Sequence, residues 1–250
     1  LGGKEASDAC FKSLDLFTAY YQIPRSASDG SWMNVQILPG RRAVFTRSAD
    51  VKAPTQVYMA VQTSRAENAY GMSTARTVAE QKETFAQAFA GQHGWRVDDF
   101  VDALKNQTSE ENFYATEVGQ VRCPKLVFGR VVLLGDAGYC PSPITGKGTT
   151  LSLTGAYILA GELARHGQDG VPEALRAYAS GVRPFVNEAQ RLIPGLLRFL
   201  YPQSRWGVWI LTTIIWLISK SRVVDLLVKF APEDSAGLKI PEYPELGLSS

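Results

Sequence analysis

The chain has 250 residues, 45% hydrophobic and 20% charged, which is ordinary for a globular protein with a sizeable core. Its net charge of +2, without a basic cluster, argues against a nucleic-acid partner. Two histidines without metal-ligand spacing predict no metal site. Three widely spaced cysteines without a CxxC pair argue against a disulfide framework and favour a reducing compartment such as the cytoplasm.

The N-terminal half predicts an antiparallel sheet after a short leading segment. The opening letters, LGGKEASDAC, contain no basic and no apolar region, so we expect no signal peptide and interpret the chain as a fragment or a processed product. Four strand-length segments follow, rich in aromatic and β-branched residues and bounded by Pro, Gly and Asp. They are 11–24, 32–40, 41–49 and 55–63. Pro39-Gly40 predicts a hairpin turn between the second and third segments.

The middle of the chain mixes helices and strands. Residues 77–89 and 97–104 show helical periodicity, and residues 111–121 and 124–128 have the composition of strands. The run 130–134 is continuously apolar after Arg130, which is typical of a strand buried on both faces. Gly135-Asp136 ends this run with a carboxylate at the position where open α/β sheets bind ligands.

The C-terminal half predicts helices. A helix from Gly148 has apolar residues at a period near 3.6, namely Leu151, Leu153, Ala156, Leu159, Ala160 and Leu163. A second helix runs from 171 to about 192, with a kink expected at Pro184. The 13 residues 206–218 are the most apolar stretch, shorter than the roughly 20 that a membrane span needs. Residues 223–231 add apolar helical turns, and 233–250 are expected to be irregular.

Several common catalytic motifs are missing from the sequence. The turn around Gly146-Lys147 lacks the first glycine and the Ser or Thr of a phosphate-binding P-loop. No GxGxxG dinucleotide motif and no GxSxG nucleophile elbow is present. The pairs Asp98-Asp99 and Glu110-Glu111 are interpreted as solvated surface charges.

The segment from Gly135 to Gly148 is the best candidate for a site. Taken alone, Asp136 could be a simple turn or cap residue. However, it is followed by Pro141 and Pro143, and then by Gly146 at the head of an apolar helix. A carboxylate, a Gly-rich turn and a helix N-terminus together predict a place for a polar, partly anionic ligand.

This run resembles the second flavin-contacting motif of FAD-dependent monooxygenases of the para-hydroxybenzoate hydroxylase group. The resemblance is closest to the branch of tetracycline-modifying and fungal salicylate-hydroxylase-like enzymes. The family motif reads GDAAH, a proline-rich turn, then GxGxN and a helix. Upstream, YYQIPRS and DGSWMNVQILPGRRAVFTR are similar to the substrate-domain sheet of the family, and the helical end with RLIPGLLRFLYP is similar to the tail of its fungal members. The resemblance covers nearly the entire chain.

The resemblance implies FAD as cofactor, NADPH or NADH as electron donor, and hydroxylation of an aromatic or polycyclic substrate with O2. Asp136, preceded by Gly135, would hydrogen-bond the ribityl chain of the flavin. The isoalloxazine edge would be lined by Pro143, Gly146, Lys147, Gly148 and Thr149. No residue is singled out as catalytic. A helix N-terminus would stabilise negative charge on a reduced flavin, and glycines would allow close approach of the backbone.

Two departures from the family pattern are tolerable: Thr150 replaces its Asn, and Tyr139 stands where the family has an aromatic residue or His. The absence of the GxGxxG that holds the ADP part of FAD is more serious, because most of the binding energy should come from there. We therefore expect this chain alone to bind FAD poorly and the strand before Gly135 to lack parallel neighbours. An alternative is a truncated, non-catalytic relative that only binds small molecules.

The expected fold class is α+β, with a remnant of an α/β flavin domain. Residues 1–128 would form a β-rich substrate domain, 129–192 the C-terminal part of the FAD-binding domain, and 193–250 a helical extension. A dry pocket over the sheet is expected near Trp32, Phe45, Tyr58 and Met59, although such residues often belong to a core. Residues 206–218 predict a helix packed over the sheet and the flavin domain, with peripheral membrane contact as the alternative.

Overall fold

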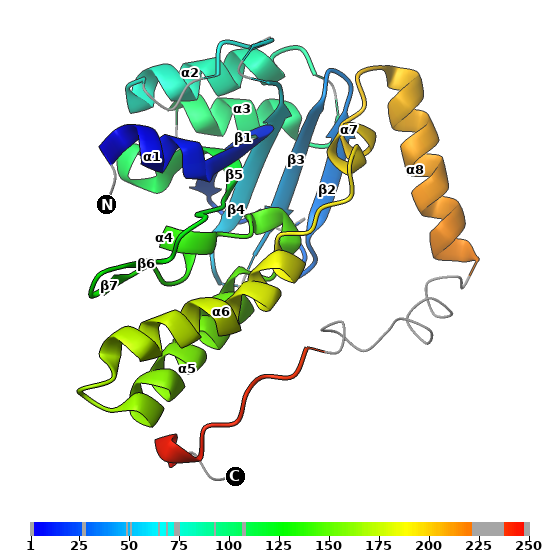
Figure 1. The fold of residues 1–250 in the computed structure, drawn as a ribbon. Helices are drawn as coiled ribbons and strands as arrows, with labels where there is room; N and C mark the ends of the chain where they lie inside the picture. Colours follow the sequence, from blue (N-terminus) through cyan, green and yellow to red (C-terminus); the bar gives the residue numbers. More distant parts are fainter. Residues whose placement is uncertain are drawn as a thin grey trace. The chain divides into compact units, whose positions relative to one another are not determined.

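The computed structural model describes residues 3–26, 29–48, 50, 52–64, 66–68, 70–72, 76–92, 94–106, 109–221 and 238–247. The chain divides into two compact units. The first contains residues 1–13, 119–193 and 226–250, and the second contains residues 14–118 and 194–225. Figure 1 labels the strands β1 (Phe11–Ile23) and β5 (Phe113–Val121). Each of these strands begins in one unit and ends in the other.

A five-stranded sheet in the order β2-β3-β4-β1-β5 is the main feature of the second unit. Its other strands are β2 (Asn34–Leu38), β3 (Arg42–Arg47) and β4 (Thr55–Gln62). The pairs β2/β3, β3/β4 and β4/β1 are antiparallel. The predicted hairpin is present, because Leu38 pairs with Arg42 and the chain turns through Gly40 at φ +77°. The sheet expected from residues 11–62 is confirmed.

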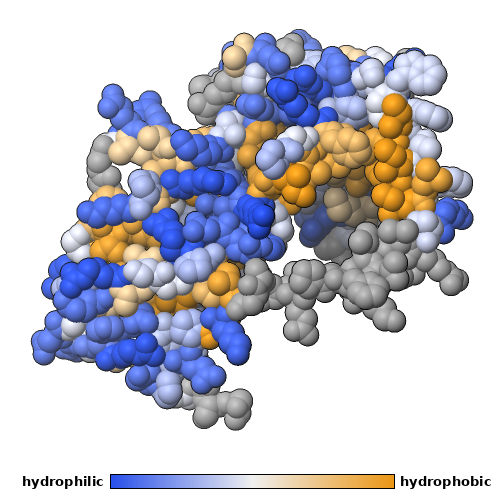
Figure 2. Space-filling model, turned by 45° about the vertical axis from the view of Figure 1, so that its right-hand side comes forward, coloured by the Kyte–Doolittle hydropathy of each residue, from blue (hydrophilic) through white to orange (hydrophobic). Residues whose placement is uncertain are grey.

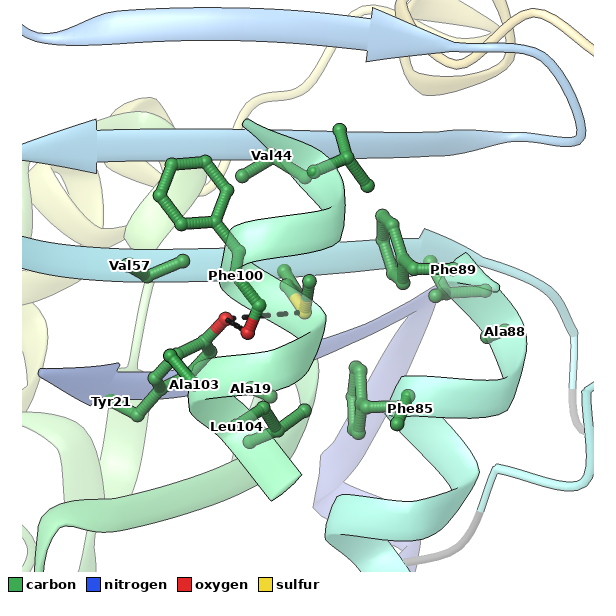
Figure 3. Close-up of a cluster of buried hydrophobic side chains, with 14 of the residues drawn as sticks. Ala19, Tyr21, Val44, Val57, Phe85, Ala88, Phe89, Phe100, Ala103 and Leu104 are labelled. Carbon is green, nitrogen blue, oxygen red and sulfur yellow. Dashed lines mark hydrogen bonds between the residues drawn. The ribbon is translucent and has the colours of Figure 1, made fainter. Parts of the chain in front are cut away.

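Two predicted helices, α2 (Val78–Phe89) and α3 (Val97–Asn106), cover one face of this sheet (Figure 3). The hydroxyl of Thr77 accepts the backbone N–H of Glu80, whose carboxylate accepts the N–H of Thr77 over 2.9 Å, so a capping box begins α2. Because side chains alternate along a strand, every second residue of β1 and β4 faces the helices. The resulting core includes Ala19, Tyr21, Val57, Met59, Phe85, Phe89, Phe100 and Leu104.

The first unit is built on two helices that lie side by side, α5 (Gly148–His166) and α6 (Val171–Ala189). The helix α6 buries Leu175, Tyr178, Val182 and Val186, as its periodicity predicts. The apolar face predicted for α5 is wrong in large part. Leu153 is 67% exposed, whereas Leu151, Thr154, Gly155 and Ile158 are buried. Small residues turn inward in α5 because they permit close packing, which a count of leucines does not reveal.

The strand predicted at 130–134 as buried on both faces is wrong. The structure has a hairpin of β6 (Val127–Phe128) and β7 (Val131–Val132) instead. Within the described residues these two strands pair only with each other, and Val131 is 50% exposed. The strand expected at 124–128 shrinks to the two residues of β6. In the described part of the chain, β7 pairs antiparallel with β6.

Short helices complete the architecture: α1 (Gly3–Cys10), α4 (Asp136–Tyr139) and α7 (Leu196–Leu200), with 3₁₀ turns at Glu110–Asn112, Pro143–Thr145 and Pro244–Leu246. The apolar segment 206–218 lies within α8 (Arg205–Lys220). This helix contacts β2 and buries Leu211, but Trp206, Trp209 and Trp216 are 75%, 59% and 58% exposed. The prediction that residues 206–218 pack over the sheet and the flavin domain is therefore confirmed only in part. The turns predicted at 223–231 lie outside the described residues.

Apolar side chains form an exposed patch in the space-filling view (Figure 2), and Ile210, Ile215 and Leu217 of α8 are 47%, 49% and 52% exposed. In the described part of the chain, none of the helices is long and apolar enough to cross a membrane.

Candidate functional site

The candidate site begins with a sharp turn after β7. Gly135 has φ +61°, a conformation that residues with a side chain rarely adopt, and it immediately precedes α4. Its carbonyl accepts the N–H groups of Gly138 and Tyr139 over 3.0 and 2.9 Å. A Cβ at this position would lie 3.1 Å from Ser152 Oγ of α5. Glycine therefore lets α4 start close against α5, with Asp136 exposed at its first position.

A second turn connects α4 to α5. Ser142 is buried and has φ +81°, which is unusual for a non-glycine residue and typical of functional segments under strain. Its carbonyl accepts both the N–H and the hydroxyl of Thr145. Gly146 then adopts a left-handed conformation, and α5 starts at Gly148. The first N–H groups of a helix have no partner within the helix, so this end is available to a ligand.

These segments surround a cavity of about 470 Å³. Its lining residues are Asp136, Cys140, Pro141, Ser142, Pro143, Gly148, Thr149, Ser152 and Leu153. The structure thus brings together four of the predicted site residues, namely Asp136, Pro143, Gly148 and Thr149. The other lining residues were not predicted to be site residues. Cys140, Pro141 and Ser142 lie within the Gly135-to-Gly148 segment, so considering the whole segment would have found them.

The remaining predicted residues lie elsewhere. Gly135 is buried against Ser152, and the N–H of Gly146 donates to the carbonyl of Pro143 over 3.1 Å. Lys147 lines a different cavity of about 310 Å³, where its Nζ lies 4.0 Å from Glu188 Oε1 of α6. The side chain of Lys147 is therefore not among those that line the cavity containing Asp136.

Two buried glutamines donate hydrogen bonds to backbone carbonyls of the second turn. Gln120 Nε2 donates to the carbonyls of Pro141 and Gln190, both over 3.0 Å. Gln190 Nε2 donates in turn to the carbonyls of Cys140 and Val121, over 3.2 and 2.7 Å. Because buried amides are costly to leave unpaired, this network fixes the position of the turn.

A tyrosine pair fixes α4 against the two long helices. The hydroxyls of Tyr139 and Tyr178 lie 3.0 Å apart, and Tyr178 Oη donates to the carbonyl of Leu133 over 2.9 Å. Gly155 of α5 passes so close that a Cβ there would lie 2.0 Å from Tyr139 Oη. The short helix carrying Asp136 is thus held from both sides.

The chemistry of the cavity suits a ligand with hydroxyl and carbonyl groups. The carboxylate of Asp136 can accept hydrogen bonds, and the N-terminus of α5 offers donors and a positive dipole end. Burial raises the pKa of the Cys140 thiol, and the charge of Asp136 adds to this, which favours the protonated thiol. A Cβ at Gly148 would meet only Pro141 Cγ at 3.9 Å, and one at Gly146 nothing within 4 Å, so the glycines leave room for a ligand.

The face of the sheet opposite the helices contains a second cavity, of about 320 Å³. The Tyr20 ring stacks edge-on against that of Tyr58 at 5.2 Å and lies 5.8 Å from that of Tyr114. Tyr58 Oη donates to Gln56 Oε1 over 2.7 Å. Burial is the largest cause that raises the pKa of Tyr20, so its hydroxyl stays a donor at neutral pH. Aromatic faces with a few polar groups are typical of a small-molecule pocket.

The four residues expected around a pocket over the sheet do not share one face. Tyr58 lines the cavity described above, and Phe45 is its cross-strand partner on β3. Met59 is fully buried on the opposite face, in the core under the helices. Trp32 precedes β2 and is 80% exposed. The expectation is therefore wrong for Met59, because neighbouring residues of a strand point to opposite faces.

No cluster of three or more His, Cys, Asp or Glu side chains that could hold a metal ion exists among the residues that the structure describes.

Comparisons with known proteins agree on one family. Residues 7–192 match the model of a family described as FAD binding domain. The chain is 34% identical over 245 residues to the FAD-dependent monooxygenase asL6 of Sarocladium schorii, covering 97% of this chain and 55% of that protein. It is 31% identical to the flavin-dependent monooxygenase eupH of a Phoma species, covering 94% of this chain and 56% of the relative.

Among solved structures, tetracycline destructase Tet(55) matches with a TM-score of 0.66 and 25% identity, covering 93% of this chain and 56% of that one. The chain thus spans about half the length of the relatives it matches.

Proposed function

Because the chain belongs to the FAD-binding-domain family of FAD-dependent monooxygenases, we propose that it supplies the flavin-ring end of the FAD site and the substrate-binding sheet of such an enzyme. One observation carries the proposal: Asp136, Gly148 and Thr149 line a single cavity at the N-terminus of α5. A carboxylate and a helix N-terminus in one cavity suit a ribityl chain and an electron-rich ring edge.

In this proposal Asp136 accepts hydrogen bonds from the ribityl hydroxyls. Pro143, Gly146, Gly148 and Thr149 line the isoalloxazine edge, and Lys147 contributes through its backbone because its side chain lies near Glu188. Bound FAD would supply the redox chemistry, with electrons from NADPH or NADH and with O2 as the oxidant. The residues of the chain bind and orient the flavin, and the N-terminus of α5 stabilises negative charge at the ring.

The open face of the sheet is proposed to bind an aromatic or polycyclic substrate. Its rings Tyr20, Tyr58 and Tyr114 offer stacking surfaces, and Gln22 and Gln56 offer hydrogen bonds. A relative named for tetracycline, a polycyclic molecule, supports this substrate class. The reaction proposed for the intact enzyme is hydroxylation of such a molecule.

Flavin titration of the purified chain tests the proposed site. The sequence contains no GxGxxG turn for the pyrophosphate, so we expect weak binding of FAD, with riboflavin binding about as well because both share the ring and ribityl chain. Asp136→Ala should weaken binding of both about tenfold or more, the loss of charge-assisted hydrogen bonds. Quenching of flavin fluorescence measures both affinities.

The matched control is Asp169→Ala, which removes an exposed aspartate beyond the end of α5. It should leave both affinities unchanged. If Asp136→Ala binds riboflavin as well as Asp169→Ala does, the ribityl role of Asp136 is wrong. Tight stoichiometric FAD binding by the unaltered chain would refute the expectation of weak binding, and no flavin binding at all would favour a non-catalytic binding module.

A peripheral membrane contact through residues 206–218 is a second proposal, supported by the exposed tryptophans of α8. The helix has no acidic residue, and Arg205 and Lys220 stand at its ends. Trp206→Ser with Trp209→Ser should reduce co-sedimentation with anionic vesicles at least tenfold, because each buried Trp contributes about 1.5–3 kcal/mol. The control is Trp32→Ser, which removes an exposed Trp outside α8. Equal loss in both variants would contradict a role for α8.

A further inference from the structure

Two of the three cysteines meet where the chain passes between its two units. Cys10 ends α1 directly before β1, and Cys123 follows β5 by two residues. The backbone N–H of Arg122 donates to the carbonyl of Cys10 over 2.7 Å. Cys123 is therefore the residue next to the backbone partner of Cys10. Cys123 is buried in an apolar cluster, and the half-buried Cys10 packs against the same cluster.

Cys10 and Cys123 are neighbours in this cluster. Burial, with a smaller contribution from the neighbouring Cys10 thiol, raises the pKa of the Cys123 thiol to about 11, so Cys123 is protonated at neutral pH. Because the thiolate is the reactive form, Cys123 is a poor first target for an oxidant. Cys10 is more exposed and is the thiol that a small oxidant reaches first.

We propose that Cys10 and Cys123 are a modification site, a dithiol that hydrogen peroxide converts to a disulfide. In the first step peroxide oxidises the Cys10 thiol to a sulfenic acid and releases one water. In the second step the sulfur of Cys123 attacks the sulfenic sulfur, the S–S bond forms, and a second water leaves. The two thiols lose two electrons and two hydrogens, and one peroxide is reduced to two waters.

The position of the pair gives this disulfide a structural consequence. The chain between the two cysteines contains all of the first segment of the second unit, residues 14–118. A bond between Cys10 and Cys123 would therefore close that segment into one covalent loop at its base. A cross-link over a long loop restricts the unfolded chain, so the oxidised protein should unfold at a higher temperature than the reduced one.

Peroxide treatment of the purified chain tests the proposal by mass spectrometry. After trypsin digestion without reduction, peptides 5–12 and 123–125 should appear as one linked species, and dithiothreitol should separate them. Thiol titration of the denatured chain should fall from three to one, because two of the three cysteines are consumed. The midpoint of thermal unfolding should rise. Three remaining thiols, over-oxidised Cys10 without a linked peptide, or a link between two chains would overturn the proposal.

Variants separate the two steps. Cys123→Ser should leave Cys10 as a sulfenic acid that dimedone labels, without a linked peptide. Cys140→Ser removes the third thiol and should leave the linked peptide intact. Dimedone labelling of Cys10 only in the Cys123→Ser variant supports Cys123 as the resolving thiol, whereas equal labelling of the unaltered chain contradicts it. The peptide map of the unaltered chain decides the proposal even if a variant does not fold.

Discussion

The five-stranded sheet and the β6–β7 hairpin both come from short apolar runs, yet only the sheet is buried. Val44 of β3 and Val57 of β4 have no exposed surface, whereas Val131 of β7 is 50% exposed. The difference lies in the neighbours. Strands β3 and β4 each pair on both edges and are covered by α2 and α3, while β6 and β7 pair only with each other within the described chain. An apolar run thus predicts an extended backbone, and its burial depends on what surrounds it.

Two side-chain truncations test this comparison with the largest expected difference in unfolding free energy. Phe100→Ala removes a fully buried ring of α3 and should cost about 3–5 kcal/mol of unfolding free energy, because it leaves a cavity in the core. Val131→Ala in β7 should cost less than about 0.5 kcal/mol, as is usual for an exposed position. Urea unfolding of both variants measures the difference.

Fluorescence assigns the larger loss to the second unit, because Trp95 stacks edge-on against Phe100 at 5.8 Å and reports on that core. Similar losses for the two variants would show that the hairpin is as well supported as the sheet, and the comparison would fail.

Sequence patterns predicted best where local chemistry decides the structure. The strands of residues 11–62 have aromatic and β-branched alternation and a Pro-Gly turn, and each formed. Gly135, Asp136 and Gly148 were read as one site, and Asp136 and Gly148 do line one cavity. At Gly135 and Gly146 the required positive φ falls on a glycine, which the sequence displays directly, whereas Ser142 adopts φ +81° without one.

The parts that could not be predicted depend on tertiary contacts. The buried face of α5 follows from Gly155 and Thr154 packing closely, which no hydrophobic period indicates. Lys147 has its side chain near Glu188, a residue 41 positions later that only the pairing of α5 with α6 brings close. The helix α1 has only eight residues and buries none of them, so its sequence was too short to indicate a helix by periodicity. The supporting role of Gln190 likewise depends on a contact 70 residues away, with Gln120.

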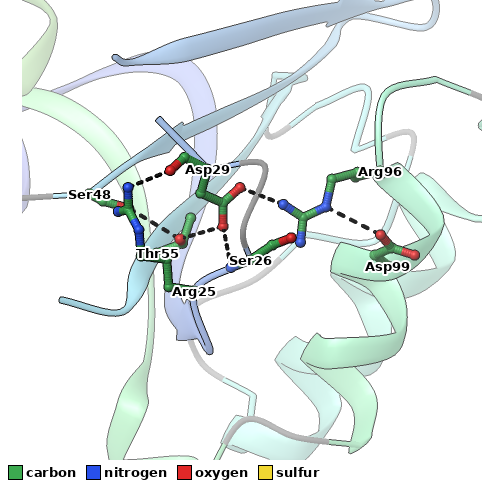
Figure 4. A network of polar contacts seen from close by, with 7 residues as sticks. All are labelled: Arg25, Ser26, Asp29, Ser48, Thr55, Arg96 and Asp99. Carbon is green, nitrogen blue, oxygen red and sulfur yellow. Dashed lines mark hydrogen bonds and ion pairs between the residues drawn. The ribbon is translucent and has the colours of Figure 1, made fainter. Parts of the chain in front are cut away.

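The second-largest effect tests a polar contact that the sheet has and the hairpin lacks among its described residues. Asp29 is 4% exposed and accepts hydrogen bonds from the backbone N–H of Ser26, the hydroxyl of Thr55 and the guanidinium of Arg96 (Figure 4). Asp29→Ala should cost about 3 kcal/mol, because it leaves a largely buried cation without this partner. Asp99→Ala, which removes the 65% exposed partner of Arg96, should cost under about 1 kcal/mol.

The pH dependence of stability gives an independent test of Asp29. Burial by itself raises the pKa of this carboxyl, but the hydrogen bonds from Ser26 and Thr55 and the charge of Arg96 outweigh it, so the pKa is lowered. A carboxyl with a lowered folded-state pKa stabilises the fold above its unfolded pKa of about 3.9 and loses this contribution as the pH falls through the folded value. The gap between the original chain and Asp29→Ala should therefore be constant from pH 7 to 5 and shrink below pH 4. A gap that widens on acidification would contradict this sign.

The smallest expected change in stability tests the close helix packing that supports the first unit. Gly155→Ala places a Cβ against the hydroxyl of Tyr139, which cannot move freely because it is buried and bonded to Tyr178. Overpacking costs about 1–3 kcal/mol and the gain in helix propensity returns about 1 kcal/mol, so a net loss of about 1 kcal/mol is expected. Gly181→Ala in α6 meets only Ile158 Cγ2 at 3.3 Å and should be neutral or slightly stabilising.

The two glycine variants also differ in their expected effect on the proposed flavin cavity. Tyr139 ends the short helix that Asp136 begins, so displacing its ring moves the carboxylate. Gly155→Ala should therefore weaken riboflavin binding several-fold, and Gly181→Ala should not change it. If Gly155→Ala lowers stability without altering flavin affinity, Tyr139 supports the fold alone and the position of Asp136 is set by the Gln120–Gln190 network instead. That outcome would assign the support of the site to the turn between α4 and α5, because the two glutamines donate hydrogen bonds to the carbonyls of Pro141 and Cys140 in that turn.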